Sequence, residues 1–66
     1  MNKEIELLGK AVIVEYRRGG KSVDQLCELL EYVKSDFIKI KNKDGKIFLI
    51  PTRQVENIKL LGDVEW

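Results

Sequence analysis

Two strand-like runs joined by an Asp-Gly pair narrow the possible folds of this chain more than any other part of its sequence. In Phe37–Asn42, apolar and basic residues alternate with the period of a strand that has one buried face. A second run, Ile47–Ile50, follows after Lys43-Asp44-Gly45-Lys46. Gly45 accepts a positive φ angle without a steric penalty, which a tight hairpin turn requires. The pattern therefore predicts an antiparallel hairpin across these residues.

The length of the hairpin turn decides which side chains share a face. Lys39 and Lys41 alternate with isoleucines, so they lie on the same face as Phe37. A two-residue turn would add Phe48 and Ile50 to that face. We therefore expect an apolar patch fringed by lysine, which on a monomer usually marks an interface.

Further strands flank the hairpin on both sides. Lys10–Arg17 is rich in β-branched and aromatic residues, and Gly19-Gly20 then interrupts it. Pro51 lacks the amide hydrogen that a strand ladder needs, so the hairpin's second strand should end there. We expect a short turn over Thr52–Gln54 and a last strand over Val55–Leu61.

Residues 22–34 fit two structures. Val23, Leu26, Cys27, Leu30 and Val33 recur at helical spacing, and Ser22 with Gln25 forms a capping-box pattern. This pattern predicts an α+β fold with a helix at about 22–34 packed on a small antiparallel sheet. The end of the segment could equally be a strand that turns directly into Phe37–Asn42, which gives a continuous β-meander.

The length and composition point to one self-associating domain over residues 1–66, with an N-terminal turn or helix at 1–9 and a tail at 62–66. A 66-residue core is marginal and is usually supported by disulfides, a metal or association. Cys27 is the single cysteine and the sequence has no histidine, so we expect no intrachain disulfide, no metal site and no cofactor. The apolar neighbours of Cys27 indicate a buried, inert thiol. Homo-oligomerisation remains as the expected support.

The charge balance limits the classes of partner that the chain is expected to bind. Twelve basic and eleven acidic residues leave a formal charge of +1, which is far from the composition of a dedicated nucleic-acid binder. The mixed N-terminus, Met1–Glu6, has neither a secretory signal nor a membrane span, so we expect a cytoplasmic protein without membrane contact. The abundance of Lys and Glu is typical of many thermophile proteins.

From Gly9 to Leu61 the chain resembles the Sm-like family of small five-stranded barrels. Gly9–Val14 has the Gly-Lys-x-Val-x-Val form of that family's first strand, and Glu28–Val33 followed by Lys34–Ile40 would supply the next two. The apolar spacing of Ile50–Ile58 matches the closing Ile-Arg-Gly-x-x-Val-x-x-Ile motif. The resemblance implies a mainly β, SH3-like barrel with a short N-terminal helix. It also implies assembly by pairing the fourth strand of one copy with the fifth strand of the next.

The family's RNA-binding residues are not present. Members that grip RNA bases use an Asp and an Asn beside the third strand together with the Arg-Gly of the closing motif. Val33, Phe37, Pro51 and Thr52 hold those places here. The resemblance therefore extends to the fold and not to the usual RNA pocket.

Two functions follow, and neither is enzymatic, because the sequence lacks histidine, the commonest general base. The first is an Sm-like homo-oligomer that binds RNA weakly through basic loops, and the second is a structural or protein-binding adaptor. No small-molecule substrate is indicated. The candidate nucleic-acid-binding residues are Arg17, Arg18, Lys21 and Arg53. The candidate oligomer-interface residues are Phe48, Ile50, Val55, Ile58 and Leu60.

Overall fold

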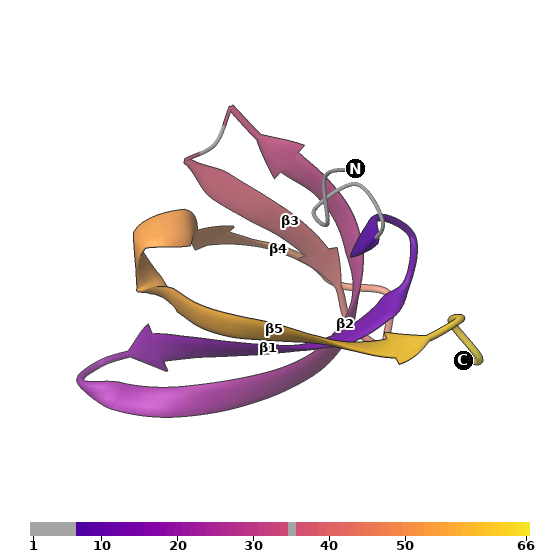
Figure 1. The fold of residues 1–66 in the computed structure, drawn as a ribbon, viewed down its shortest axis with the longest axis horizontal. Helices are drawn as coiled ribbons and strands as arrows, with labels where there is room; N and C mark the ends of the chain where they lie inside the picture. The colour runs from indigo at the N-terminus through magenta and orange to yellow at the C-terminus, as the bar shows by residue number, and fades with distance from the viewer. Residues whose placement is uncertain (1–6, 35) are drawn as a thin grey trace.

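The computed structural model describes residues 7–34 and 36–66, which form a five-stranded antiparallel sheet in the order β4-β3-β2-β1-β5 (Figure 1). Consecutive strands pair from β1 to β4, and the chain then returns so that β5 pairs with β1. The strands are β1 (Ala11–Arg18), β2 (Lys21–Val33), β3 (Phe37–Lys41), β4 (Ile47–Pro51) and β5 (Val55–Gly62). The prediction of a mainly β chain is confirmed.

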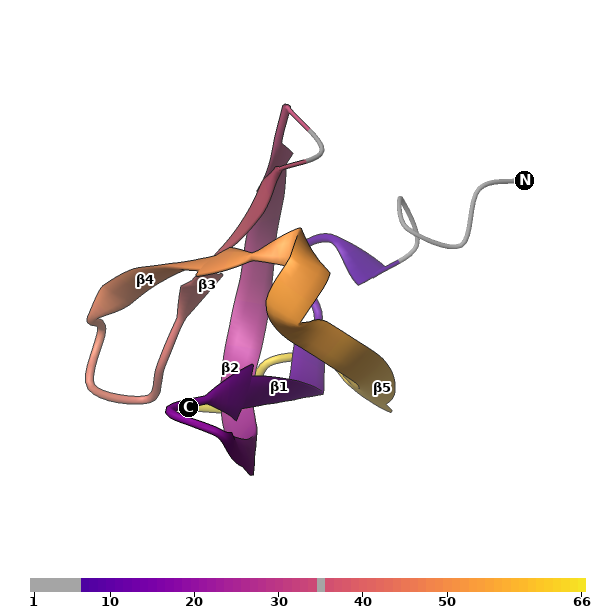
Figure 2. The ribbon, with the colours of Figure 1, turned by 90° about the vertical axis from the view of Figure 1, so that its left-hand side faces the viewer.

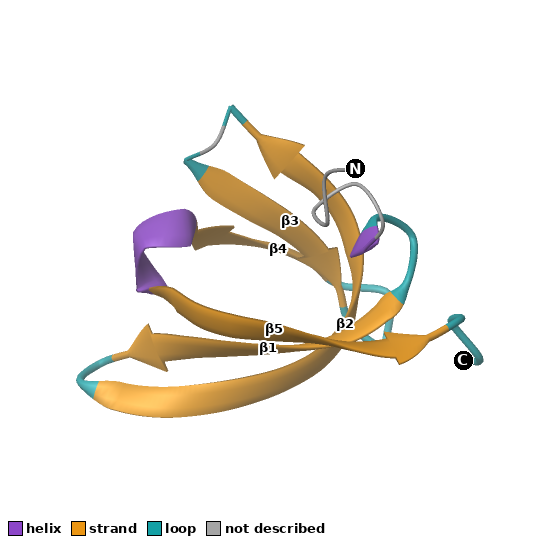
Figure 3. Cartoon of the chain, viewed as in Figure 1, coloured by secondary structure: helices purple, strands orange, loops and turns teal. Residues whose placement is uncertain are grey.

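The sheet is strongly curled but is not closed by strand pairing, because β4 and β5 are its two edges (Figure 2). A short 3-10 helix, η1 (Thr52–Gln54), joins these edge strands, as expected for the turn after Pro51. Figure 3 shows η1 as a single turn between the two edge strands. The turn or helix expected over 1–9 falls mostly on residues 1–6, which lie outside the described part of the chain; Leu7 has helical backbone and residues 8–9 form a turn.

The β1–β2 connection is a two-residue hairpin turn. Arg18 pairs with Lys21, and Gly19 and Gly20 between them have φ angles of 57° and 79°. Positive φ at both central residues gives the turn a backbone twist that matches the twist of paired strands. The Gly-Gly break in the sequence therefore marks a hairpin.

The alternative of a helix at about 22–34 is wrong, because Lys21–Val33 is the longest strand, β2. β2 pairs with β1 along its first part and with β3 along its second part, so both neighbours supply backbone hydrogen bonds that a helix would forgo. The apparent helical spacing mixes two faces of this strand: Cys27 is buried, whereas Leu26 is largely exposed. An irregularity between Leu29 and Glu31 also shifts the register, which breaks simple alternation.

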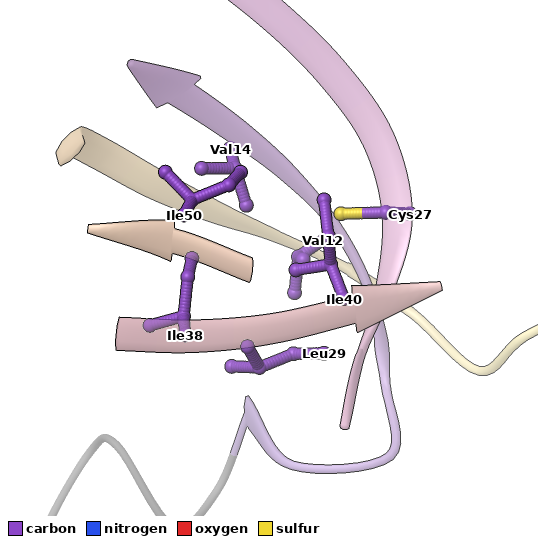
Figure 4. Close-up of a cluster of buried hydrophobic side chains, with 7 residues drawn as sticks. All are labelled: Val12, Val14, Cys27, Leu29, Ile38, Ile40 and Ile50. Carbon is purple, nitrogen blue, oxygen red and sulfur yellow. The ribbon is translucent and has the colours of Figure 1, made fainter. Parts of the chain in front are cut away.

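The core lies on the concave face of the curled sheet (Figure 4). β1, β2, β3 and β4 all contribute side chains to it, and half-buried residues from β1, β2 and β5 pack around them. The buried cluster consists of Val12, Val14, Cys27, Leu29, Ile38, Ile40 and Ile50. Ile38 and Ile40 point into this cluster while the lysines between and after them do not, as the alternation in β3 predicts.

The hairpin predicted around Asp44-Gly45 is confirmed, but its register differs from the expected one. Lys41 pairs with Ile47, so residues 42–46 form the connection in place of a two-residue turn. The Asn42 side-chain oxygen accepts hydrogen bonds from the backbone N–H groups of Asp44 and Lys46, each at 3.0 Å. Gly45 adopts a φ of 85° in this loop.

This longer connection moves each β4 side chain to the opposite face from the one expected, because strand side chains alternate with period two. Ile50 pairs with Ile38 in the core, and Phe48 pairs with Ile40 on the same concave side. Leu49 instead lies across from Lys39. The expectation that Phe48 and Ile50 share a face with Phe37 was therefore wrong.

Candidate functional site

The four candidate phosphate-binding cations lie on two neighbouring elements. Arg17, Arg18 and Lys21 are exposed at the β1–β2 hairpin, and Arg53 is exposed in η1. Pairing of Tyr16 with Val55 sets η1 beside the end of β1, so the hairpin and η1 lie at the same end of the molecule (Figure 1). The fold thus brings together residues that are more than thirty positions apart in the sequence.

The four cations differ in how far they are already engaged. The Arg17 guanidinium donates to the Gly20 carbonyl oxygen at 3.2 Å and lies 3.8 Å from a Glu56 carboxylate oxygen. That carboxylate also accepts a short hydrogen bond from the Ser22 hydroxyl. Arg18, Lys21 and Arg53 form no ion pair with any described residue. These last three are therefore the cations best able to receive an external anion.

The lysines of the outer face are not equivalent to these cations, because each has a carboxylate partner across the strands. The Lys39 ammonium lies 2.7 Å from Glu31, and Lys41 lies 3.7 Å from Glu28. Lys59 lies 2.9 Å from Glu15, and this hydrogen bond raises the pKa of Lys59 above its ordinary value. Ion pairs this exposed contribute little to stability, but they leave the outer face without a free basic patch.

A cavity of about 290 Å³ opens on the concave side between β4, the β1–β2 end of the sheet and η1. We call it the β4 cavity. Aliphatic residues of β3 and β4 line part of its wall. The residues that could recognise a ligand are two aromatic and three polar side chains: Tyr16, Phe48, Arg18, Gln25 and Gln54. The sequence reasoning singled out Arg18 and Phe48 and missed the other three.

A second cavity, of about 230 Å³, lies where β4 meets η1, and Pro51 lines both cavities. We call it the Phe37 pocket, and it is lined by Asp36, Phe37, Pro51, Thr52 and Arg53. The Thr52 backbone N–H donates to the Asp36 carbonyl oxygen at 2.8 Å, which ties the β2–β3 turn to η1. Phe37 pairs with Val33 on one side and with Pro51 on the other. Val33, Phe37, Pro51 and Thr52, which the resemblance to Sm-like proteins places at the RNA-binding positions, are thus neighbours in this fold.

The candidate interface residues divide into three groups. Ile50 is 5% exposed and belongs to the chain's own core. Val55 and Ile58 are half-buried and pack against that core. Phe48 and Leu60 lie on the edge strands and are 43% and 55% exposed. Of the five residues, only these last two present large apolar surface to a partner.

Three exposed edge residues were not among those candidates. Ile47 and Leu49 of β4 and Leu61 of β5 are all more than half exposed. For β4, the sequence analysis assumed a two-residue turn, although the connection is longer. This assumption put the wrong β4 side chains on the exposed face. For β5, a register shift between Ala11 and Val12 interrupts the alternation at its end, which the sequence pattern does not reveal.

Cys27 is fully buried in the core, as predicted. Burial raises the pKa of its thiol to about 11, because the apolar surroundings disfavour the thiolate. Its thiol also lies 3.7 Å from the Gln25 carbonyl oxygen, within range of a weak hydrogen bond. The residue is a small apolar core side chain whose reactive form is suppressed.

No family model, no curated protein and no solved structure matches this chain. Within residues 7–34 and 36–66, no three His, Cys, Asp or Glu side chains come together in a group that could hold a metal ion. The described residues also form no helix with the length and apolar character needed to cross a lipid bilayer.

Proposed function

We propose that this chain is a non-catalytic, cytoplasmic subunit of an Sm-like homo-oligomer that binds RNA weakly through basic loops. In this proposal the curled sheet acts as an SH3-like barrel, and β4 of one copy pairs with β5 of the next. The observation that carries it is the location of the exposed large apolar side chains. Of the eight such side chains within residues 7–34 and 36–66, five are on the two edge strands: Ile47, Phe48, Leu49, Leu60 and Leu61.

An edge-to-edge contact would serve two needs at once. Unpaired edge strands expose rows of backbone N–H and C=O groups that another strand can satisfy. The same contact would remove water from Ile47 and Leu49 on the outer face of β4 and from Leu60 and Leu61 on β5, which supports a small core lacking a disulfide. Phe48 lies on the opposite, concave face of β4. Because β4 and β5 are different surfaces, the contact is head-to-tail and either closes into a ring or continues as a filament.

The RNA part of the proposal rests on Arg18, Lys21 and Arg53, the three unengaged cations at one end of each subunit. Contacts from these side chains to phosphates would release counterions, so binding weakens as salt increases. Three contacts to single-stranded RNA correspond to a loss of affinity of about 20-fold between 50 and 200 mM salt. Phosphate contacts carry no base information, so this loss should be similar for every RNA sequence.

The test measures mass and RNA binding together. Light scattering over a wide concentration range should give a mass of several chains, and fluorescence anisotropy should detect salt-sensitive binding of short U-rich and A-rich RNA. Replacing Arg18, Lys21 and Arg53 by alanine should weaken both RNAs equally. A triple alanine variant of Lys39, Lys41 and Lys59 is the charge-matched control, because these lysines are already ion-paired. A single-chain mass at all concentrations would refute the assembly.

The second candidate function is a structural or protein-binding adaptor without nucleic-acid activity. It is favoured by the engagement of Arg17 with Gly20 and Glu56 and by the near-neutral charge of +1. It is also favoured by the Val33, Phe37, Pro51 and Thr52 side chains that replace the base-binding residues of Sm-like proteins. An oligomer that binds neither RNA at low salt would support this function over the first.

A further inference from the structure

We propose that the β4 cavity is a nucleotide subsite, in which one base contacts the two aromatic rings and its phosphate reaches Arg18. This inference deepens the proposed RNA function and rests on it for the source of the nucleotide. Tyr16 comes from β1 and Phe48 from β4, two strands that β2 and β3 separate in the sheet. The sheet is curled (Figure 2), and both rings line the same cavity.

The cavity has a suitable size and wall for a nucleobase with its ribose. Its volume of about 290 Å³ is near the lower limit of typical small-ligand sites, which are mostly apolar with a few polar groups. Aromatic rings and aliphatic side chains provide surfaces against which any base can stack. Phe48 is 43% exposed, so its ring is partly accessible without rearrangement of the core.

The polar residues of the cavity have free hydrogen-bonding capacity. The side chains of Arg18, Gln25 and Gln54 make no hydrogen bond or ion pair with any described residue. A glutamine amide offers both donors and an acceptor, which suits the edge of an unpaired base. Arg18 supplies a guanidinium for a phosphate, and no acidic residue lines the cavity.

The alternative occupant is an apolar side chain from a second copy docked on β4. Such a side chain would remove water from the two glutamines and Arg18 without giving them hydrogen-bond partners, which is unfavourable. A nucleotide covers the same apolar wall and also pairs with these groups. The composition of the wall therefore favours the nucleotide.

The experiment titrates isotope-labelled protein with UMP and AMP and, as a base-free probe, ribose 5-phosphate, followed by NMR. Both nucleotides should shift the side-chain amide signals of Gln25 and Gln54, and they should bind at least about fivefold more tightly than ribose 5-phosphate because of stacking. Phe48→Ala should weaken nucleotide binding at least about fivefold. Gln54→Ala, at an exposed position, provides a second variant that leaves the core intact.

Phe37→Ala is the matched control, since it removes a similarly exposed phenyl ring from the other cavity and should leave nucleotide affinity unchanged. Equal binding of ribose 5-phosphate and UMP, or shifts confined to the Phe37 pocket, would overturn the subsite.

A parallel titration with short oligouridine and a base-free oligomer of equal length separates the two proposals. If both oligomers bind equally, the subsite fails and the RNA function stands. If mononucleotides bind in the cavity but oligouridine does not bind, the RNA function fails and the subsite stands.

Discussion

Replacing Ile50 by alanine tests the β4 register directly, with Leu49→Ala as the neighbouring control. Ile50 is 5% exposed and pairs with Ile38 in the core, whereas Leu49 is 55% exposed on the other face. Truncating Ile50 removes roughly three buried methylene equivalents at about 0.8 kcal/mol each, and the cavity left behind adds to this loss. We expect a destabilisation of about 2–4 kcal/mol. Leu49→Ala should cost about 1 kcal/mol or less, because much of that side chain is in water in the folded monomer.

The loss expected for Ile50→Ala is large compared with the total free energy of unfolding. A 66-residue domain has a free energy of unfolding of about 3–10 kcal/mol, so Ile50→Ala should remove about a fifth or more of it. Its melting temperature should fall by more than about 10 °C. Urea unfolding followed by far-UV circular dichroism gives the free energy of unfolding, and thermal unfolding followed in the same way gives the melting temperature. It should be run at two low protein concentrations, because any loss in an oligomer depends on concentration. A greater loss for Leu49→Ala than for Ile50→Ala would refute the register and restore the two-residue turn.

Three further perturbations follow from other parts of the structure. As the pH rises from 9.0 towards 11, the unfolded Cys27 thiol ionises before the folded one, so the free energy of unfolding should fall by about 2–3 kcal/mol. Cys27→Ala should lack this component in pH-dependent denaturation, and rapid labelling of native Cys27 would contradict its burial. Gly45→Ala should cost about 1–2 kcal/mol through its φ of 85° alone, since no atom lies within 4 Å of the added methyl group. A synthetic protein with D-alanine at this position should show no such loss. Leu61→Glu on edge strand β5 should lower the mass measured by light scattering, whereas Leu26→Glu on the interior strand β2 should not.

Features that depend on local chemistry could be predicted from the amino-acid sequence. Alternation in Phe37–Asn42 identified β3 and its buried isoleucines, since a strand with one wet face needs a period of two. Asp44-Gly45 located one hairpin and Gly19-Gly20 located the end of the first strand, because residues that tolerate positive φ fit at both places. The absence of a second cysteine and of histidine excluded an intrachain disulfide and the usual zinc ligands without reference to any fold.

The candidate sites could be predicted only in part. Arg18, Lys21 and Arg53 were recognisable as cations, but their proximity depends on the pairing of β1 with β5. Gln25 and Gln54 carried no signal of a binding site, because a glutamine in a strand or turn is common on ordinary protein surfaces. The β4 cavity exists only because the curl of the sheet brings β1 and β4 to opposite sides of one concave surface.

Tertiary structure alone decided two further questions. Residues 22–34 have local helical spacing, and they form β2 because β1 and β3 both pair with them, which outweighs a weak local preference. The faces of β4 depended on the number of residues in the preceding connection, where a change of one residue in register exchanges inside and outside. Local sequence sets the propensity of a strand, but its partners and register come from contacts between distant residues. For that reason, the position of Ile50 in the core and of Leu49 at the surface could be known only from the folded chain.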